Sequence, residues 1–335
     1  MNYLEDFNGF HKYDSISSVR MCGNIDLNPK FSIIIPTYKR PALLKQAIAS
    51  CLAQTYSDFT ITIVDNDGDN KRLDIYKLVK SFSDDRIVYY RNEKNIGVYA
   101  NTLRGFELSK CEWCVLLNDD DLLHPQYLQI LDSAIKSLKL KGVVGSVPMN
   151  FTGTVPAVGK YKSFSVRKIS KIRFFLGDSI TSPGFAFKKE ILYDIYNPFE
   201  ELLMGDQIIQ YKGLVKYGLY LIENPCAFYR CSNENETLKD GRVVSMMYNM
   251  SAFKSQLSSH NLVLFMYNKF FYKWHTFNYV YGWLSGWKKE HFLYPIMMRL
   301  GIHNYPLNWG KGCFLEGCVW NFLNRLPVQR KKIYL

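Results

Sequence analysis

Short apolar runs alternate with stretches of helical spacing between residues 31 and 138, and this alternation constrains the fold most. The predicted strands, rich in β-branched residues, are 31–35, 60–64, 86–90 and 113–117. The predicted helices between and after them are 40–56, 71–80, 98–109 and 125–138. Strands that alternate with helices in this way form a parallel sheet covered by helices on both faces. The sequence therefore predicts an α/β fold.

The pattern weakens beyond Asn150. A strand at 185–187, a helix at 206–217 and a strand at 219–222 are still predicted, and from about Thr237 the sequence is helical and aromatic. Hydrophobic residues make up 47% and charged residues 21%, which supports a sizeable core and excludes wholesale disorder. We expect an N-terminal leader on the surface (1–29), an α/β domain (30–236) and a basic, aromatic, helical C-terminal region (237–335).

The formal charge of +12 is concentrated near the C-terminus. The segment from Ser251 onward contains eleven Lys and Arg residues and only two acidic residues, Glu290 and Glu316. Its net charge is therefore +9, which leaves +3 for the first 250 residues. Aromatic residues are interleaved with this charge, namely Phe270, Phe271, Tyr272, Trp274, Trp283 and Trp287. The combination suits an anionic membrane surface, single-stranded nucleic acid, or an ordinary helical domain with a basic face. We favour peripheral membrane contact and expect no nucleic-acid partner.

The chain's first residues, MNYLEDFNGF, lack the basic and then apolar pattern of a secretory signal. No apolar run reaches about 18 residues, so we expect no spanning helix and a cytoplasmic location, peripheral on the membrane's inner face. Of eight cysteines, Cys111 and Cys114 form a C-x-x-C, which suggests zinc or redox chemistry. A buried strand is the preferred interpretation of this pair, because no second C-x-x-C completes a tetrahedral site.

Three consecutive carboxylates, Asp119 to Asp121, follow the predicted strand 113–117. They repel one another, and such a cluster is costly unless a positive group binds there. A hard divalent cation that bridges substrate phosphate oxygens is the natural partner. The alternative is a polar turn in which Asp121 caps the next helix.

Polar residues also follow the other strands, at Thr37, at Asp65 and in Asn95-Ile96-Gly97. Each has a simpler interpretation as part of a strand-to-helix turn or an Asx-turn. Ligands of open α/β sheets bind outside the carboxyl ends of the strands. We therefore expect Thr37, Asp65 and the acidic run 118–121 to converge in space.

Four runs together resemble a family 2 glycosyltransferase of the GT-A fold, over roughly residues 30–230. They are Ile-Ile-Pro-Thr-Tyr-Lys-Arg-Pro, Ile-Val-Asp-Asn, Asn-Ile-Gly-Val-Tyr-Ala-Asn and Leu-Asn-Asp-Asp-Asp-Leu-Leu-His-Pro. The resemblance implies a Rossmann-like, mixed and mostly parallel sheet flanked by helices. It also implies transfer of a sugar from a nucleoside-diphosphate sugar, commonly a UDP-sugar, to an acceptor hydroxyl with inversion.

The resemblance also implies the role of each site residue. The residues expected to bind the nucleotide sugar are Pro36, Thr37, Tyr38, Arg40 and Asn95, with Asp65 at the base and Asn118 or Asp119 at the ribose. Asp120 would bind Mg²⁺ or Mn²⁺, and Asp206 would be the catalytic base. Apart from the resemblance, we hypothesise that Arg230 contacts the phosphates or a lid. The sequence departs from the family at Asn118, where Asp is usual, and at Gly205, where Glu is common. For Asp206, which could instead be an N-cap, we expect a pKa near the reference value of about 3.9.

Two other classes of protein compete with this interpretation. A nucleotidyltransferase that makes sugar nucleotides also needs metal-binding carboxylates, but its first loop is Gly-rich with Lys or Arg, and here it is Pro-Thr-Tyr. A non-catalytic basic module that binds lipid or nucleic acid would make no use of the acidic run. We favour the transferase, with a glycan or lipid-linked glycan acceptor in bacterial surface-polysaccharide synthesis of the O-antigen or capsule type.

Overall fold

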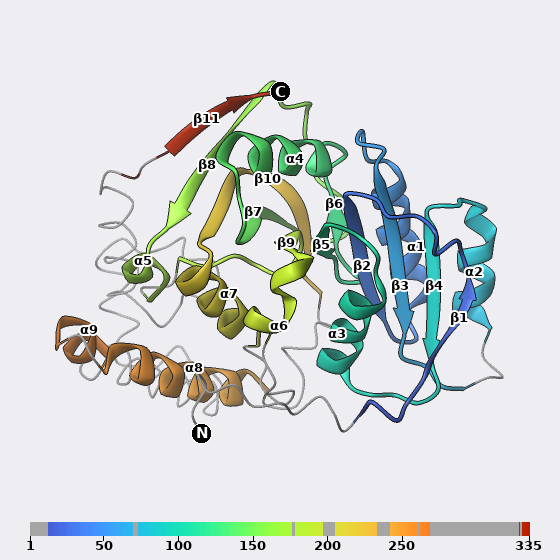
Figure 1. Cartoon of the computed structure of the whole chain (residues 1–335), viewed down its shortest axis with the longest axis horizontal. Helices are drawn as coiled ribbons and strands as arrows, with labels where there is room; N and C mark the ends of the chain where they lie inside the picture. The colour runs from blue at the N-terminus through green and yellow to red at the C-terminus, as the bar shows by residue number, and fades with distance from the viewer. Residues whose placement is uncertain are drawn as a thin grey trace.

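The fold is built on one mixed sheet with helices on both of its faces (Figure 1). The computed structural model describes residues 13–69, 73–175, 178–196, 205–232, 242–259, 262–268, 328 and 330–335. Within these residues the sheet has eleven strands in the order β1-β4-β3-β2-β5-β9-β7-β10-β8-β11, and β6 pairs with β10.

The first half of the sheet is parallel, as the sequence predicts. Its strands are β2 (Phe31–Thr37), β3 (Phe59–Asp65), β4 (Ile87–Asn92) and β5 (Trp113–Leu116). The helices that connect and follow them are α1 (Pro41–Leu52), α2 (Asp74–Phe82), α3 (Val98–Leu108) and α4 (Tyr127–Leu138). Almost every residue of these strands is buried, which explains why they appear in the sequence as continuous apolar runs.

Two apolar cores lie on opposite faces of the sheet. Ile33 and Ile35 of β2 pack in one core with α1, α2 and α4. Ile34, which points the other way, packs in the second core with α3, α6 (Leu192–Ile195) and α7 (Gly205–Lys216). This alternation along one strand is what a sheet sandwiched between two helical layers requires.

The second half of the sheet is mixed. It contains β7 (Val143–Phe151), β8 (Ser163–Ile169), β9 (Phe185–Lys188) and β10 (Leu219–Arg230), with the short β6 (Leu122–Leu123) and α5 (Lys171–Phe175) beside them. The strand predicted at 219–222 is confirmed but continues to Arg230, because β10 pairs with β7 along its length and with β6 and β8 along parts of it. The sequence analysis did not predict β6, β7 or β8.

Two edge strands come from segments that were expected to have another structure. β1 (Ser18–Cys22), in the expected leader, pairs antiparallel with β4, and β11 (Arg330–Tyr334) pairs antiparallel with β8. The expectation of helix at 330–334 is therefore wrong, since these residues bond to a strand edge. The helical prediction is confirmed at α8 (Arg242–Ser258) and α9 (Leu262–Tyr267).

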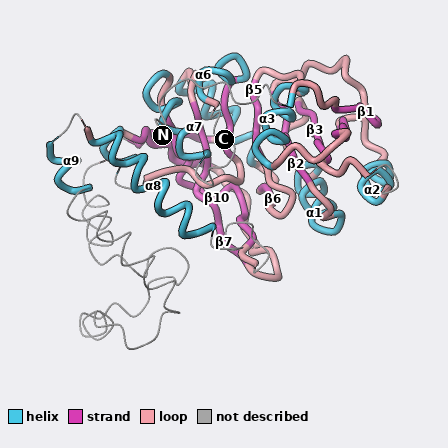
Figure 2. Tube along the Cα trace, turned by 90° about the horizontal axis from the view of Figure 1, so that it is seen from below, coloured by secondary structure: helices cyan, strands magenta, loops and turns pink. Residues whose placement is uncertain are grey.

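Helix α8 packs beside α7, as both views show (Figures 1 and 2). The rings of Tyr211 and Phe253 meet edge to face with centroids 5.9 Å apart. The aromatic residues predicted to contact a membrane, from Phe270 to Trp287, lie outside the described residues. None of the helices in the described part has the length and apolarity to cross a bilayer.

The strand order reverses at β2. The chain adds β3 and β4 on one side of β2 and then returns to place β5 on the other side. In open α/β sheets the crevice at such a switch point, beyond the carboxyl ends of the strands, is where ligands bind. A ligand site is therefore expected at the loops after β2 and β5.

Close contact between α3 and β2 supports this arrangement and depends on Gly105. A Cβ at this position would lie 2.4 Å from the Cγ2 of Ile34. We predict that Gly105→Ala lowers the free energy of unfolding by about 1–3 kcal/mol through overpacking, although Ala is the better helix former by about 1 kcal/mol. Chemical denaturation measures the change. Gly159→Ala, where an added Cβ meets nothing within 4 Å, is the control and should be neutral.

Candidate active site

At the switch point, a hydrogen bond joins the loop after β2 to the loop after β5. The hydroxyl of Thr37 donates to Oδ2 of Asp119 over 2.8 Å. Thr37 also stands opposite Asp65 in the parallel pairing of β2 with β3, and its carbonyl accepts from the N–H of Asn66 over 2.9 Å. The predicted convergence of Thr37, Asp65 and the acidic run at one rim is confirmed.

Arg40, which precedes α1, lies against the acidic run. Its Nη1 is 3.4 Å from Oδ1 of Asp119 and 3.3 Å from Oδ2 of Asp120. Burial raises the pKa of Asp119 to about 6, against the hydrogen bond from Thr37. Burial also raises the pKa of Asp120, and the positive charges of Arg40 and Arg230 oppose this shift. The guanidinium of Arg40 thus neutralises part of the charge that the run creates.

The third carboxylate, Asp121, is turned away from the other two. Its Oδ1 accepts from the backbone N–H of Arg230 over 2.9 Å, and its Oδ2 accepts from Nδ2 of Asn118 over 3.0 Å. Burial and the negative charge of Asp120 raise its pKa to about 7. Asp121 therefore anchors the loop to the end of β10. It is not the helix cap considered above, since α4 begins at Tyr127 without a side-chain cap.

Arg230 reinforces this anchor. Its Nε donates to the carbonyl of Asp120 over 2.8 Å, its Nη2 donates to Oε1 of Gln46 over 2.8 Å, and its guanidinium lies 4.6 Å from the ring centre of Phe151. Arg230 thus shapes the acidic loop directly in this structure.

Asn95 and Tyr38 form the polar rim next to Thr37. Oδ1 of Asn95 accepts from Nδ2 of Asn66 and from the N–H of Gly97, each over 2.9 Å, so the amide of Asn95 has a fixed orientation. Hydrogen bonds with Lys39 and then with Asn95 lower the pKa of Tyr38. Tyr38 is 42% exposed as a residue, and the ammonium of Lys39 lies 4.8 Å from its ring centre. A partly exposed ring of this kind can stack on a planar ligand.

Asp65 lies at the expected rim but is fully buried. Its Oδ2 accepts from the hydroxyl of Tyr89 over 2.8 Å and lies 3.5 Å from Nε of Arg91, while its Oδ1 accepts from the N–H of Asp67 over 3.1 Å. Burial raises its pKa in spite of these partners. The carboxylate thus holds β4 and its own loop, and a base that approaches it has to share these contacts.

Asp206 lies in the first turn of α7, at the same edge of the sheet as the loops that follow β2 and β5. Because α7 precedes β10, which runs parallel to β7, the N-terminus of α7 faces the carboxyl ends of the parallel strands. Nε2 of Gln207 donates to Ser179 over 3.1 Å, and Ser182 in the same loop accepts from Nδ2 of Asn118 over 3.0 Å. These bonds tie the start of α7 to the acidic run.

The pKa of Asp206 is not near 3.9 as expected. Burial raises it to about 6, and the N–H of Gln207, which donates to Oδ1 over 2.9 Å, offsets this only in part. The sequence could not reveal the shift, because burial depends on how α7 packs. A carboxylate with this pKa is ionised at neutral pH and is better matched to accept a proton there.

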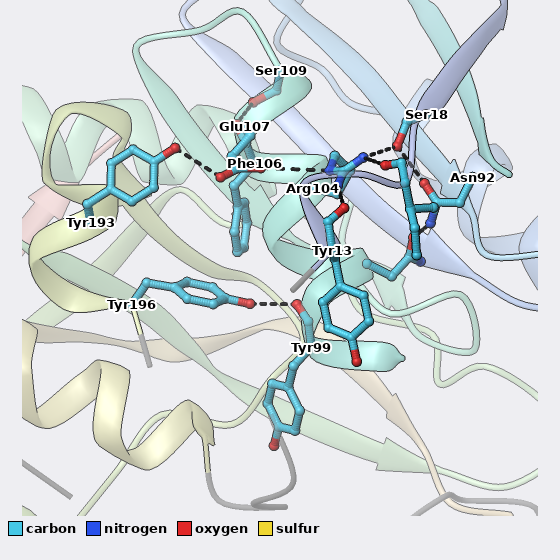
Figure 3. Close-up of polar contacts among 12 residues, drawn as sticks. Tyr13, Ser18, Asn92, Tyr99, Arg104, Phe106, Glu107, Ser109, Tyr193 and Tyr196 are labelled. Carbon is cyan, nitrogen blue, oxygen red and sulfur yellow. Dashed lines mark hydrogen bonds and ion pairs between the residues drawn. The ribbon is translucent and has the colours of Figure 1, made fainter. Parts of the chain in front are cut away.

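Tyr99 links α3 to this helix start. Its hydroxyl accepts from the N–H of Gly205 over 3.2 Å. Its carbonyl accepts from the hydroxyl of Tyr196 over 2.7 Å (Figure 3). Burial and the nearby charge of Asp206 raise the pKa of Tyr99. Tyr99 belongs to the run Asn-Ile-Gly-Val-Tyr-Ala-Asn, but the sequence predicts no role for it. Ser182 and Gln46 are not predicted from the sequence, since neither follows a predicted strand.

Among the residues that the structure describes, protein groups alone do not form a metal site. In the described part of the chain, no three His, Cys, Asp or Glu side chains gather to hold a metal ion. Asp119 and Asp121 are engaged elsewhere, while the side chain of Asp120 is 19% exposed. Mg²⁺ commonly takes one or two carboxylates and completes its shell with substrate phosphates and water. Asp120 fits a cation that arrives with a diphosphate.

The fold and the acidic rim together define a GT-A-type α/β protein, with a mostly parallel sheet and its site at the switch point. Residues 32–195 match the model of glycosyl transferase family 2. The similarity to this family is carried by that stretch, which is just under half of the chain.

A curated relative supports this assignment. The GalNAc(5)-diNAcBac-PP-undecaprenol beta-1,3-glucosyltransferase of Campylobacter jejuni is 28% identical over 211 residues, which are 60% of this chain and 65% of that protein. The match thus spans less than two thirds of this relative's length.

Solved structures support the fold. Staphylococcus aureus TarS 1-349 in complex with UDP-GlcNAc has a TM-score of 0.55 at 16% identity, with 72% of each chain covered. Mannosyltransferase PcManGT from Pyrobaculum calidifontis, in complex with GDP-Man and Mn²⁺, has a TM-score of 0.56 at 12% identity, covering 84% of this chain and 81% of that one.

The raised pKa of Asp206 predicts a pH-dependent cost in stability. A carboxyl whose pKa is higher in the folded state favours folding at low pH, and this contribution is lost as the pH rises through about 6. Asp206→Asn should therefore raise the melting temperature at pH 8 by about 2–4 °C, the shift that ~1 kcal/mol produces. At pH 4 the difference should disappear. Differential scanning calorimetry measures both values.

The matched control is Asp58→Asn, which replaces an exposed aspartate. An equal change in melting temperature at pH 4 and pH 8 for Asp206→Asn would show that its carboxyl is not held at a raised pKa.

Proposed function

We propose that this chain is a glycosyltransferase that moves a sugar from a nucleoside-diphosphate sugar to an acceptor hydroxyl with inversion. The observation that carries the proposal is the contact of Thr37 and Arg40 with Asp119 and Asp120 at the switch point of the sheet. This contact leaves the carboxylate of Asp120 partly exposed beside the guanidinium of Arg40. The family's donor diphosphate is expected at this position. The family assignment of residues 32–195 supports the same reaction class.

The proposed donor is UDP-linked. A structural neighbour, TarS, is solved with UDP-GlcNAc, which supports a uridine nucleotide at this fold position. Tyr38 is partly exposed, and the amide of Asn95 next to it is held in a fixed orientation by its Oδ1 contacts. Pro36 and Thr37 end β2 beside them, and Asp65 lies one strand away for the base. Asn118 and Asp119 are the proposed ribose contacts.

Asp120 is the proposed ligand of Mg²⁺ or Mn²⁺. The mannosyltransferase neighbour with GDP-Man and Mn²⁺ supports metal use in this fold. A divalent cation at this position supplies neutralisation of the charge that gathers on the departing diphosphate. Arg40 contributes to the same end, because its guanidinium already lies within 3.4 Å of both carboxylates and can reach phosphate oxygens.

Asp206 is the proposed catalytic base. An acceptor hydroxyl is a weak nucleophile, and removal of its proton as it attacks the anomeric carbon is typically worth about 10²–10⁴ in rate. The carboxylate is largely ionised at pH 7, because its pKa is about 6. Tyr99 and the loop that carries Ser179 hold the helix start in place. A single displacement of this kind inverts the anomeric configuration.

The proposed acceptor is a glycan or a lipid-linked glycan in bacterial surface-polysaccharide synthesis. The Campylobacter relative is named for a polyprenyl-diphosphate-linked acceptor, which supports this class. The basic charge of +9 after Ser251 supports peripheral contact with an anionic membrane and a place on the cytoplasmic face of that membrane. Nucleic acid has no part in the proposal.

Asp120→Asn tests the donor site. We expect the wild-type chain to bind UDP more tightly with Mn²⁺ than without it, and the variant to lose most of this difference, since the amide is a poorer metal ligand. Isothermal titration calorimetry with UDP, with and without Mn²⁺, measures both affinities. Asp26→Asn, a change at an exposed position, should behave as the wild type does.

An unchanged metal effect in Asp120→Asn would remove this residue from the metal site. Release of pyrophosphate from UTP and a sugar phosphate would instead identify a nucleotidyltransferase.

Asp206 should set the pH dependence of turnover. Below about pH 6 the base is protonated, so kcat should rise about tenfold per pH unit and level off above the pKa. Asp206→Asn should lose about 10²–10⁴ in kcat while it keeps the affinity for UDP. A pH profile of sugar transfer checks the first statement, and calorimetry with UDP checks the second. A flat profile from pH 5 to 8 would exclude Asp206 as the base.

A further inference from the structure

Cys111 and Cys114 lie at the opposite edge of the sheet from the proposed active site. β5 runs from Trp113 to Leu116, so the pair marks its amino end, while the acidic run follows its carboxyl end. The sequence analysis placed both cysteines in a buried strand, but this is correct only for Cys114, which is fully buried in β5. Cys111 precedes the strand in a bend and is half-buried.

The bend brings the two thiols together. The Sγ atoms of Cys111 and Cys114 are 3.7 Å apart, and the hydroxyl of Ser109 lies 3.7 Å from each of them. Ser109, at the end of α3, is itself fixed by a 2.9 Å hydrogen bond to the carbonyl of Phe106 (Figure 3). Two sulfur atoms at this separation need only a small approach to reach the bond length of a disulfide, about 2.05 Å.

A cation lies beside the pair. The ammonium of Lys189 donates to the carbonyl of Glu107 over 3.1 Å and to the carbonyl of Ser109. The hydrogen bond from Cys114 lowers the pKa of Cys111 against the effect of burial, and Ser109 and the charge of Lys189 lower it further. Burial raises the pKa of Cys114. The more accessible thiol is therefore the more acidic one, which is the arrangement of a reactive pair.

We propose that Cys111 and Cys114 form a reversible disulfide by exchange with a low-molecular-weight disulfide such as oxidised glutathione. The thiolate of Cys111 attacks one sulfur of the small disulfide, and the first small thiolate leaves. Cys114 then loses its proton and attacks the Cys111 sulfur of the mixed disulfide, and the second small thiolate leaves. In total, two protein thiols are oxidised, one small disulfide is reduced and two small thiols are released.

A zinc site is the other use of a C-x-x-C. Structural zinc takes four ligands, usually Cys or His. Among the residues that the structure describes, no group of three or more potential ligands gathers around this pair. The geometry supplies two thiols and a neighbouring ammonium, and these favour thiol chemistry over binding of a cation.

The test equilibrates the full chain with mixtures of reduced and oxidised glutathione of increasing ratio and maps the products by peptide mass spectrometry. We expect a Cys111–Cys114 disulfide, seen as a loss of two hydrogen atoms from one peptide, that reverts on addition of dithiothreitol. In Cys114→Ser, which lacks the second thiol, a glutathione adduct should accumulate on Cys111. The wild-type map decides the question even when this variant fails to fold.

Alkylation rates supply the matched control. Cys22 is also half-buried, but burial raises its pKa, so iodoacetamide at pH 7 should modify Cys111 about tenfold faster than Cys22. Equal rates would overturn the role of Cys111 as the attacking thiol. A lasting glutathione adduct on wild-type Cys111, or two free thiols at the highest oxidised ratio, would overturn the disulfide.

Discussion

The rest of the site depends on how the protein accommodates three adjacent carboxylates at the end of a buried strand. Each one is given different partners: Thr37 bonds to Asp119, Arg40 lies against Asp119 and Asp120, and Asp121 turns to the end of β10. Burial still raises the pKa of all three. Like charges held together in this way disfavour ionisation, and the loop is stable only because positive groups and N–H donors surround it.

The three carboxylates of this short loop differ in how far their partners leave them exposed to a ligand. Asp119 and Asp121 tie the loop to β2 and β10, while Asp120 keeps a partly exposed carboxylate beside Arg40. Asp206, at the start of α7, is a further carboxyl group whose pKa is raised by burial, to about 6. Groups with perturbed pKa values gather at functional sites, and proteins commonly give up stability to keep them there.

Sequence reasoning worked where local pattern and tertiary environment agree. The strands from β2 to β5 are buried on both faces, so they appear as apolar runs, and their carboxyl ends had to meet at one rim. It failed for β1 and β11, edge strands whose residues, apart from the buried Ile333, are half-exposed or exposed and show no strand signal. It also failed for the pKa of Asp206 and the inward turn of Asp65, because both depend on contacts between distant segments.

The most direct test of the account is a crystal structure with UDP and Mn²⁺, recorded with the anomalous signal of manganese. The account predicts one manganese peak at about 2.0–2.3 Å from a carboxylate oxygen of Asp120, bridging to the diphosphate, with the uracil near Tyr38 and Asn95. A nucleotide bound at the other edge of the sheet, or manganese ligated away from Asp120, would contradict it.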